Sequence, residues 1–103
     1  MNLEELVNRS EAIRSAYHQL ELKQDGHAWT IEQDTLAFQS DAGLVSRLVM
    51  ADQGSWPTDV KEPTLDYKIA ECIWWLSSIA TASDVNLEEA LEHFMSEREQ
   101  QLK

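Results

Sequence analysis

Three charged side chains stand on predicted helix faces that are otherwise apolar, and these residues are the ones best placed to do chemistry. Lys68 and Glu71 are three residues apart in a long apolar run, so they are neighbours on one helix face. Asp41 shares the apolar stripe of another predicted helix with Phe38 and Val45. A carboxylate in such a place is costly unless an ion pair or a metal ion compensates its charge. We therefore expect these three groups to meet in a shared interior.

The element that carries Lys68 and Glu71 is a predicted helix over residues 65–80. This run lacks Gly and Pro, and its apolar residues recur at helical spacing, at Ile69, Cys72/Ile73, Leu76 and Ile79/Ala80. Tyr67, Ala70, Trp74 and Trp75 make the other faces largely apolar as well, so we expect other helices to surround this one. Because a chain of 103 residues can bury only a limited core, this pattern favours a dimer or a higher homo-oligomer.

Three further helices are predicted from capping signals and apolar periodicity. The first begins at Asn2, with Glu5 completing a capping box, and ends near Gly26. The second follows Trp29 and the capping box Thr30-Ile-Glu-Gln33, and the last follows Asn86 with Glu89 as its box partner. The expected buried stripe of the first helix is Leu3, Leu6/Val7, Ile13, Ala16/Tyr17 and Leu20.

These four helices with short connections predict an all-α fold, an antiparallel four-helix bundle forming a single domain over residues 1–103. The inward stripe of the second helix is expected to be Ala37/Phe38, Val45 and Leu48/Val49, and a loop is expected over residues 54–59. The net charge of −11 argues against nucleic acid or an anionic membrane as a partner. The acidic N-terminus does not resemble a signal peptide, and the single cysteine excludes an internal disulfide, so we expect a cytoplasmic protein.

Three stretches of the chain resemble motifs of the MazG-like family of all-α nucleoside triphosphate pyrophosphohydrolases. Trp29-Thr30 opens a helix that carries SDAGLV at 40–45, which resembles the family's Glu-Glu-x-Gly-Glu-Leu segment. KIAECIWWL at 68–76 is similar to the family's Glu-Leu-x-Asp-Val-Leu-Trp-Tyr-Leu segment, and NLEEAL at 86–91 looks like the start of its final helix. The resemblance covers about the last three quarters of the chain.

The resemblance implies a magnesium site, because acidic residues on these two helices of the family hold Mg²⁺ ions that bind the triphosphate. It leaves Asp41 and Glu71 as residual metal ligands, while Ser40, Leu44 and Lys68 replace the other acidic residues. Magnesium can be held by one or two carboxylates when phosphates supply the remaining oxygens. An ammonium group, however, repels a divalent ion and can pair with both acids itself. We therefore expect Lys68 to replace the metal with an ion-pair cluster.

Nucleotide contacts are expected at Lys68, Trp56 and Trp29, and no residue is assigned a catalytic role. Lys68 could bind a phosphate as a point charge. Trp56, in the Gly-Pro loop near the expected mouth of the site, could stack on a base, and so could Trp29. Trp74 and Trp75 are expected in the core.

The residues and the resemblance leave three functions open. The first is a MazG-like protein that binds nucleoside triphosphate, with Mg²⁺-dependent hydrolysis weakened or lost. The second is an active pyrophosphohydrolase that takes its missing ligands from elsewhere, for example from Asp34, Asp66 or a partner subunit. The third is a non-catalytic module for oligomerisation or interaction with a protein partner.

Overall fold

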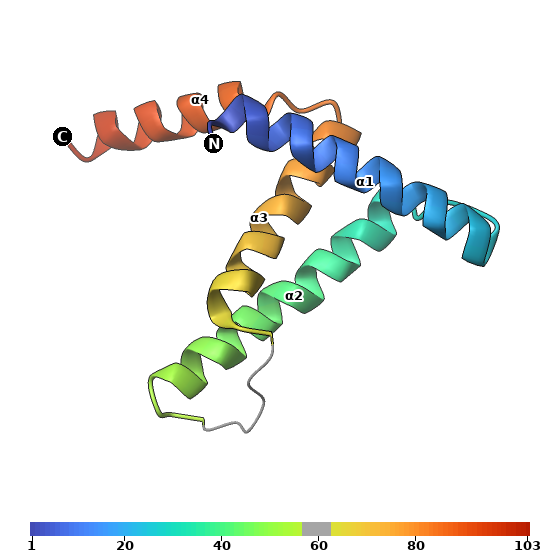
Figure 1. Cartoon of the computed structure of the whole chain (residues 1–103). Helices are drawn as coiled ribbons and strands as arrows, with labels where there is room; N and C mark the ends of the chain where they lie inside the picture. The colour runs from blue at the N-terminus through green and yellow to red at the C-terminus, as the bar shows by residue number, and fades with distance from the viewer. Residues whose placement is uncertain (57–62) are drawn as a thin grey trace. The chain divides into compact units, whose positions relative to one another are not determined.

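The computed structural model describes residues 1–56 and 63–103, and in these ranges the chain forms four α-helices and no strand. The helices are α1 (Leu3–Asp25), α2 (Ile31–Asp52), α3 (Leu65–Ala82) and α4 (Leu87–Gln101) (Figure 1). This confirms the prediction of an all-α protein with four helices. None of the helices in the described ranges combines the length and the apolar character that crossing a bilayer requires. Of the loop predicted over residues 54–59, the part that follows Trp56 lies outside the described residues.

The helices group into two compact units. One unit contains Met1–Ala28 and Ser77–Lys103, and the other contains Trp29–Leu76. α3 contributes its residues up to Leu76 to the second unit and the remainder to the first.

The N-terminal caps follow the sequence prediction closely. Asn2 Oδ1 accepts the Glu5 N–H at 2.8 Å, and Glu5 Oε1 accepts the Asn2 N–H at 3.4 Å, which completes the capping box of α1. Gly26 ends α1 in the left-handed region (φ 80°), where glycine carries no Cβ penalty, and its N–H donates to the Leu22 carbonyl at 3.1 Å. Local sequence signals therefore fix both ends of this helix.

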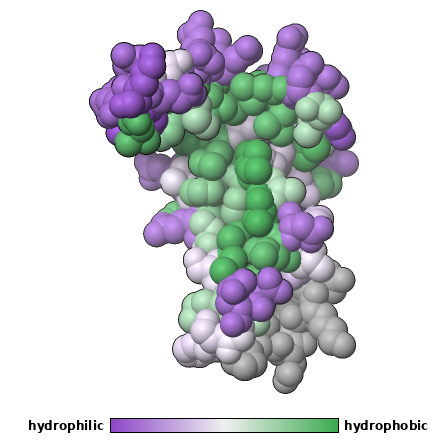
Figure 2. Space-filling view, turned by 90° about the vertical axis from the view of Figure 1, so that its left-hand side faces the viewer, coloured by the Kyte–Doolittle hydropathy of each residue, from purple (hydrophilic) through white to green (hydrophobic). Residues whose placement is uncertain are grey.

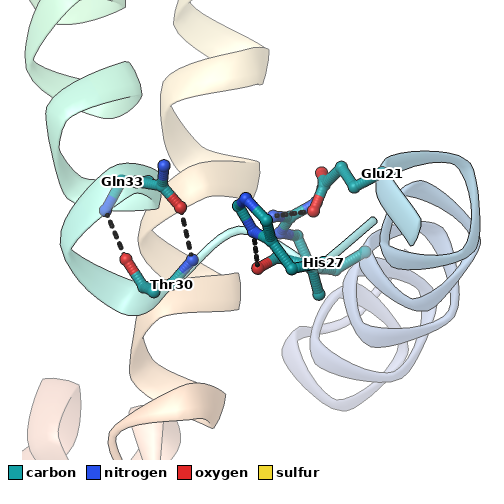
Figure 3. Close-up of polar contacts among 6 residues, drawn as sticks. Glu21, His27, Thr30 and Gln33 are labelled. Atoms are coloured by element: carbon teal, nitrogen blue, oxygen red, sulfur yellow. Dashed lines mark hydrogen bonds and ion pairs between the residues drawn. The ribbon is translucent and has the colours of Figure 1, made fainter. Parts of the chain in front are cut away.

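α2 begins with the second predicted capping box. Thr30 Oγ1 accepts the Gln33 N–H at 3.2 Å, and Gln33 Oε1 accepts the Thr30 N–H at 2.9 Å (Figure 3). At the start of α4, Asn86 Oδ1 accepts the Glu89 N–H at 3.0 Å. The reciprocal bond expected from the Glu89 side chain is not formed there, so the prediction of a full box at this helix is wrong in its second half.

α1 buries a different face from the one that its apolar residues predicted. Ser10 and Arg14 are 2 % and 6 % exposed, whereas Ile13, Tyr17 and Leu20 are each about half exposed. Arg14 lines a cavity of about 150 Å³ that α1 shares with the end of α3. Serine is small enough to permit close helix approach. Arg14 is compensated by an ion pair of 2.9 Å with Glu21, which is among the residues drawn in Figure 3. The predicted stripe is correct only in the first turns, where Leu3, Leu6 and Val7 are half-buried.

α4 belongs to the same unit but leaves most of its surface uncovered. Leu87 is half-buried, and every later residue of the helix is exposed. α1 and the start of α4 line a shared cavity of about 240 Å³, to which Leu3, Val7, Val85 and Leu87 contribute. Beyond that point α4 leads away from α1 (Figure 1).

In the second unit, α2 and the first part of α3 run in opposite directions (Figure 1). The inward stripe predicted for α2 is half-buried at Ala37, Phe38, Val45 and Leu48, whereas Val49 is 41 % exposed. Trp75 is the large apolar side chain most deeply buried in this unit, at 7 % exposure, and its ring lies 4.6 Å from that of Trp74.

The outer side of α3 does not follow the prediction that other helices surround it. Ile69, Ile73 and Leu76 were expected to be buried, but they are 43 %, 47 % and 48 % exposed. α2 covers the side of α3 that carries Lys68 and Trp75, and a helix packed on one neighbour keeps its opposite side uncovered.

Candidate functional site

The three charged residues singled out in the sequence meet between α2 and α3. Lys68 Nζ lies 3.2 Å from Asp41 Oδ1 on the facing helix and 2.6 Å from Glu71 Oε1 one turn further along its own helix. Lys68 is only 8 % exposed, whereas the side chains of Asp41 and Glu71 are 20 % and 29 % exposed. We call these three residues the Lys68 cluster. Its geometry is the one expected from the sequence.

Trp75 is a fourth member of the arrangement that the sequence did not reveal. Its indole Nε1–H donates to Asp41 Oδ2 at 2.9 Å, so both oxygens of this carboxylate are engaged. Trp75 follows Lys68 by seven residues, and this spacing places both side chains on one helix face. A buried indole N–H also requires an acceptor. These two signals together could have identified Trp75 as a partner of Asp41 rather than as a plain core residue.

The two carboxylates hold the Lys68 amine in its charged form. The hydrogen bond that Lys68 donates to Glu71 contributes most to raising the pKa of Lys68 above its ordinary value. The hydrogen bond that it donates to Asp41 and the two negative charges raise this pKa further, and burial opposes them. The amine is therefore protonated at neutral pH, and the Lys68 cluster carries a formal charge of −1.

Cys72 lies beside the Lys68 cluster, and the charges of the cluster shift the pKa of its thiol. Burial, followed by the negative charges of Asp41 and Glu71, raises the pKa of the Cys72 thiol, while the positive charge of Lys68 lowers it. At neutral pH the sulfur is therefore a thiol, which is a weak nucleophile and a poor metal ligand. This agrees with the place of Cys72 among the apolar residues of the helix predicted over 65–80.

The Lys68 cluster does not fit a magnesium ion. Mg²⁺ requires oxygens in near-octahedral geometry at about 2.0–2.1 Å. Here an ammonium lies against one oxygen of Asp41, and an indole N–H occupies the other. Leu44, one turn after Asp41, offers no oxygen. In residues 1–56 and 63–103, no three His, Cys, Asp or Glu side chains are grouped so that they could hold a metal ion.

Asp34 and Asp66, the acids considered as substitute ligands, lie in other environments. Asp34 is 4 % exposed near the start of α2. Asp66 lies in the first turn of α3, where hydrogen bonds from the Thr64 side chain and the Tyr67 backbone lower the pKa of its carboxyl. Neither of them belongs to a group of three potential metal ligands in the described ranges.

The tryptophans predicted to contact a nucleotide flank the two ends of α2. Trp29 is 37 % exposed just before the helix, and Trp56 is 50 % exposed shortly after it. A helix of 22 residues is about 33 Å long, so one nucleotide cannot contact both indoles. The Arg47 guanidinium lies over the Trp56 ring, 4.4 Å from its centroid. A half-exposed aromatic ring beside a cation is suited to a planar or anionic group.

The site therefore offers a fixed ammonium rather than a reactive group. Lys68 could act as a point charge for an anion, provided that the anion displaces one of the two carboxylates. Glu71 is the more exposed of these, so it is the one that an anion from solvent would reach first, although its contact of 2.6 Å with Lys68 is shorter than the 3.2 Å contact of Asp41.

Comparisons of the chain with models of known protein families, with curated protein sequences and with solved structures gave no match in any of the three.

Proposed function

We propose that this chain is a MazG-like protein in which the Lys68 cluster takes the place of the family's metal site, so that it binds nucleoside triphosphate while Mg²⁺-dependent hydrolysis is weakened or lost. The proposal rests on the resemblance of the segments at 40–45 and 68–76. One observation carries it: Lys68 Nζ lies 3.2 Å from Asp41 and 2.6 Å from Glu71. The two acids that remain from the family's metal ligands are thus paired with an amine.

Hydrolysis of the family's type needs a divalent ion to neutralise the phosphates and to activate the attacking water. An ion between Asp41 and Glu71 would have to expel a protonated amine that is 8 % exposed, and it would then be close to a positive charge. Binding of a triphosphate makes a smaller demand, because the anion has only to replace Glu71 at the amine. The raised pKa of Lys68 keeps the charge that such binding requires.

Calorimetric titration with deoxynucleoside triphosphates tests this proposal, with and without Mg²⁺ and alongside an assay for pyrophosphate release. We expect the wild-type chain to bind triphosphate without metal and to release no pyrophosphate. Lys68→Met should remove the binding. Lys23→Met, which removes a lysine in the exposed last turn of α1, is the matched control and should have no effect. Pyrophosphate release that depends on Mg²⁺ would refute the loss of hydrolysis, and unchanged binding by Lys68→Met would refute the role of the amine.

A non-catalytic interaction module is the second candidate, and the pairing within the Lys68 cluster favours it. Each of the three groups already has a partner of opposite charge, and Asp41 has the Trp75 N–H as well. A cluster satisfied in this way can serve only to fix the register of α2 against α3. If no nucleotide binds under any of these conditions, this candidate replaces the first.

We extend the first proposal to the assembly of the fold. An antiparallel four-helix bundle needs all its helices to share a core, yet α4 exposes every residue after Leu87. The bundle would therefore be completed by helices of a second chain, in a dimer or a tetramer.

A further inference from the structure

The cavity that α1 shares with the start of α4 combines an apolar floor with an acidic rim. Leu3, Val7 and Leu87 on its floor are half-buried, and Val85 beside them is 47 % exposed. The remaining lining residues are polar and exposed: Glu4 and Asn8 from α1, and Asn86 and Glu88 from the start of α4. In Figure 2, hydrophilic side chains gather around the upper part of the view, where α1 and α4 lie. We call this space, of about 240 Å³, the α1–α4 cavity.

The charged side chains in this lining are two glutamates, one from each helix. Glu4 lies in the first turn of α1 and Glu88 in the first turn of α4. Acidic residues are favourable in a first turn because of the helix dipole, but each helix has a second first-turn glutamate, Glu5 or Glu89, that does not line the cavity. In the described part of the chain, neither Glu4 nor Glu88 forms an ion pair. The α1–α4 cavity therefore carries an uncompensated formal charge of −2.

Neither an anion nor a bare metal ion matches this lining. The N-termini of two helices could attract an anion, but the Asn2 and Asn86 side chains already accept N–H groups of these first turns, and the two carboxylates repel negative charge. A hard metal cation needs about six oxygens, and the apolar floor supplies none. Within the described residues, no third acidic, His or Cys side chain joins the two glutamates in a group that could hold a metal ion.

A ligand that matches both the floor and the rim is an alkyl chain with an ammonium group at each end. Its methylene groups would cover the floor, as the stem of a buried lysine covers apolar surface, and each ammonium would meet one carboxylate. A single ammonium, such as the lysine side chain of a partner protein, would leave Glu4 or Glu88 without a counter-charge. The volume of about 240 Å³ lies just below the range of about 300–1,000 Å³ typical of small-molecule sites, so the ligand must be short.

We propose that the α1–α4 cavity binds a linear aliphatic diammonium ion, the chemical class to which the polyamines belong. The net charge of −11 assists this binding, because it raises the concentration of cations around the whole chain. All lining residues belong to the unit of Met1–Ala28 and Ser77–Lys103, whereas Lys68 belongs to the other unit. This inference therefore does not depend on the proposed function.

Titration of the full wild-type chain with 1,4-diaminobutane, followed by the NMR shifts of methyl groups, tests the proposal. We expect saturable shifts at Leu3, Val7, Val85 and Leu87. Butylamine has the same alkyl chain but one ammonium, and it should bind roughly two- to fivefold more weakly because one exposed ion pair is lost. Mg²⁺ at the same ionic strength carries the charge without the methylene groups and should leave these methyl shifts unchanged. Equal binding of butylamine and the diamine would overturn the proposal, and so would equal shifts with Mg²⁺.

A pair of double variants with equal net charge tests the two carboxylates. Glu4→Gln combined with Glu88→Gln should raise the dissociation constant of the diamine roughly tenfold, because both exposed ion pairs are lost. Glu89→Gln combined with Glu99→Gln removes the same charge from exposed positions of α4 outside the cavity and should leave the constant unchanged within about twofold. Two double variants that bind the diamine equally well would show that only the overall charge attracts it, which would overturn the proposal. The comparison of ligands on the wild-type chain decides the matter if a variant does not fold.

Discussion

At the scale of single residues, the Lys68 cluster is a little-exposed ammonium held by two carboxylates, one on its own helix and one on the facing helix. Lys68 stands three residues before Glu71 on α3, and its amine reaches both Glu71 and Asp41. Ion pairs with little solvent exposure stabilise a fold mainly in the sense that removing one partner is costly. The cluster is therefore better understood as a fixed contact between α2 and α3 than as a set of reactive groups.

The pKa of the Cys72 thiol responds to the charges of the Lys68 cluster, so a titration of this thiol measures them. Because the positive charge of Lys68 lowers the pKa of the thiol and the charges of Asp41 and Glu71 raise it, we expect Lys68→Met to raise this pKa further and Glu71→Gln to lower it. The pH dependence of iodoacetamide alkylation gives the midpoint directly, since only the thiolate reacts. In Lys68→Met the midpoint should move to higher pH, and at a fixed pH of about 8 the reaction should become slower.

Lys23→Met serves as the control for this titration, because it removes the same charge from an exposed position on α1. A midpoint that stays unchanged in Lys68→Met would show that the amine does not lie beside Cys72 in solution.

At the scale of elements, the antiparallel contact of α2 with α3 decides which side chains can share a ligand. Asp41 and Leu44 present one side of α2, and Lys68 and Glu71 present the facing side of α3. Changing Leu44 and Lys68 to glutamate would place four carboxylates on the two faces, an oxygen-rich set of the kind that a hard cation prefers.

We therefore expect Leu44→Glu combined with Lys68→Glu to bind Mg²⁺, and the metal to stabilise this variant by roughly 2–3 kcal/mol at about 100 times its dissociation constant. Thermal unfolding with and without Mg²⁺ measures the effect. The wild-type chain and the single variant Leu44→Glu, which keeps the amine, should show no such shift. A double variant that folds but ignores Mg²⁺ would show that the helix faces lack the geometry of a metal cage.

At the scale of the whole molecule, the net charge opposes association of two copies of the chain, and the exposed apolar surface favours it. Two copies of a chain with a charge of −11 repel one another, and this repulsion weakens when salt screens it. We expect the dissociation constant of the proposed dimer to fall by roughly tenfold between low and physiological ionic strength. Sedimentation at several salt concentrations measures this. A dimer that weakens with salt would indicate an interface of ion pairs rather than of apolar side chains.

The sequence by itself determined the features that depend on neighbours along the chain. The helix ends at Asn2, Gly26 and Thr30 follow from caps whose donors and acceptors lie within four residues of one another. The meeting of Asp41 with Lys68 and Glu71 was also predictable, because a charge on an apolar stripe requires a partner and only a few were available.

The tertiary structure alone decided which faces are covered. Apolar periodicity predicted that the buried face of α1 carries Ile13, Tyr17 and Leu20, but the residues buried there are Ser10 and Arg14. Serine is small enough to permit close helix approach, and an ion pair compensates the charge of the arginine. Ile69 and Ile73 likewise remain exposed. Periodicity identifies a face that must be buried, but it does not say whether the same chain or another one buries it, because the hydrophobic effect depends on area and not on direction.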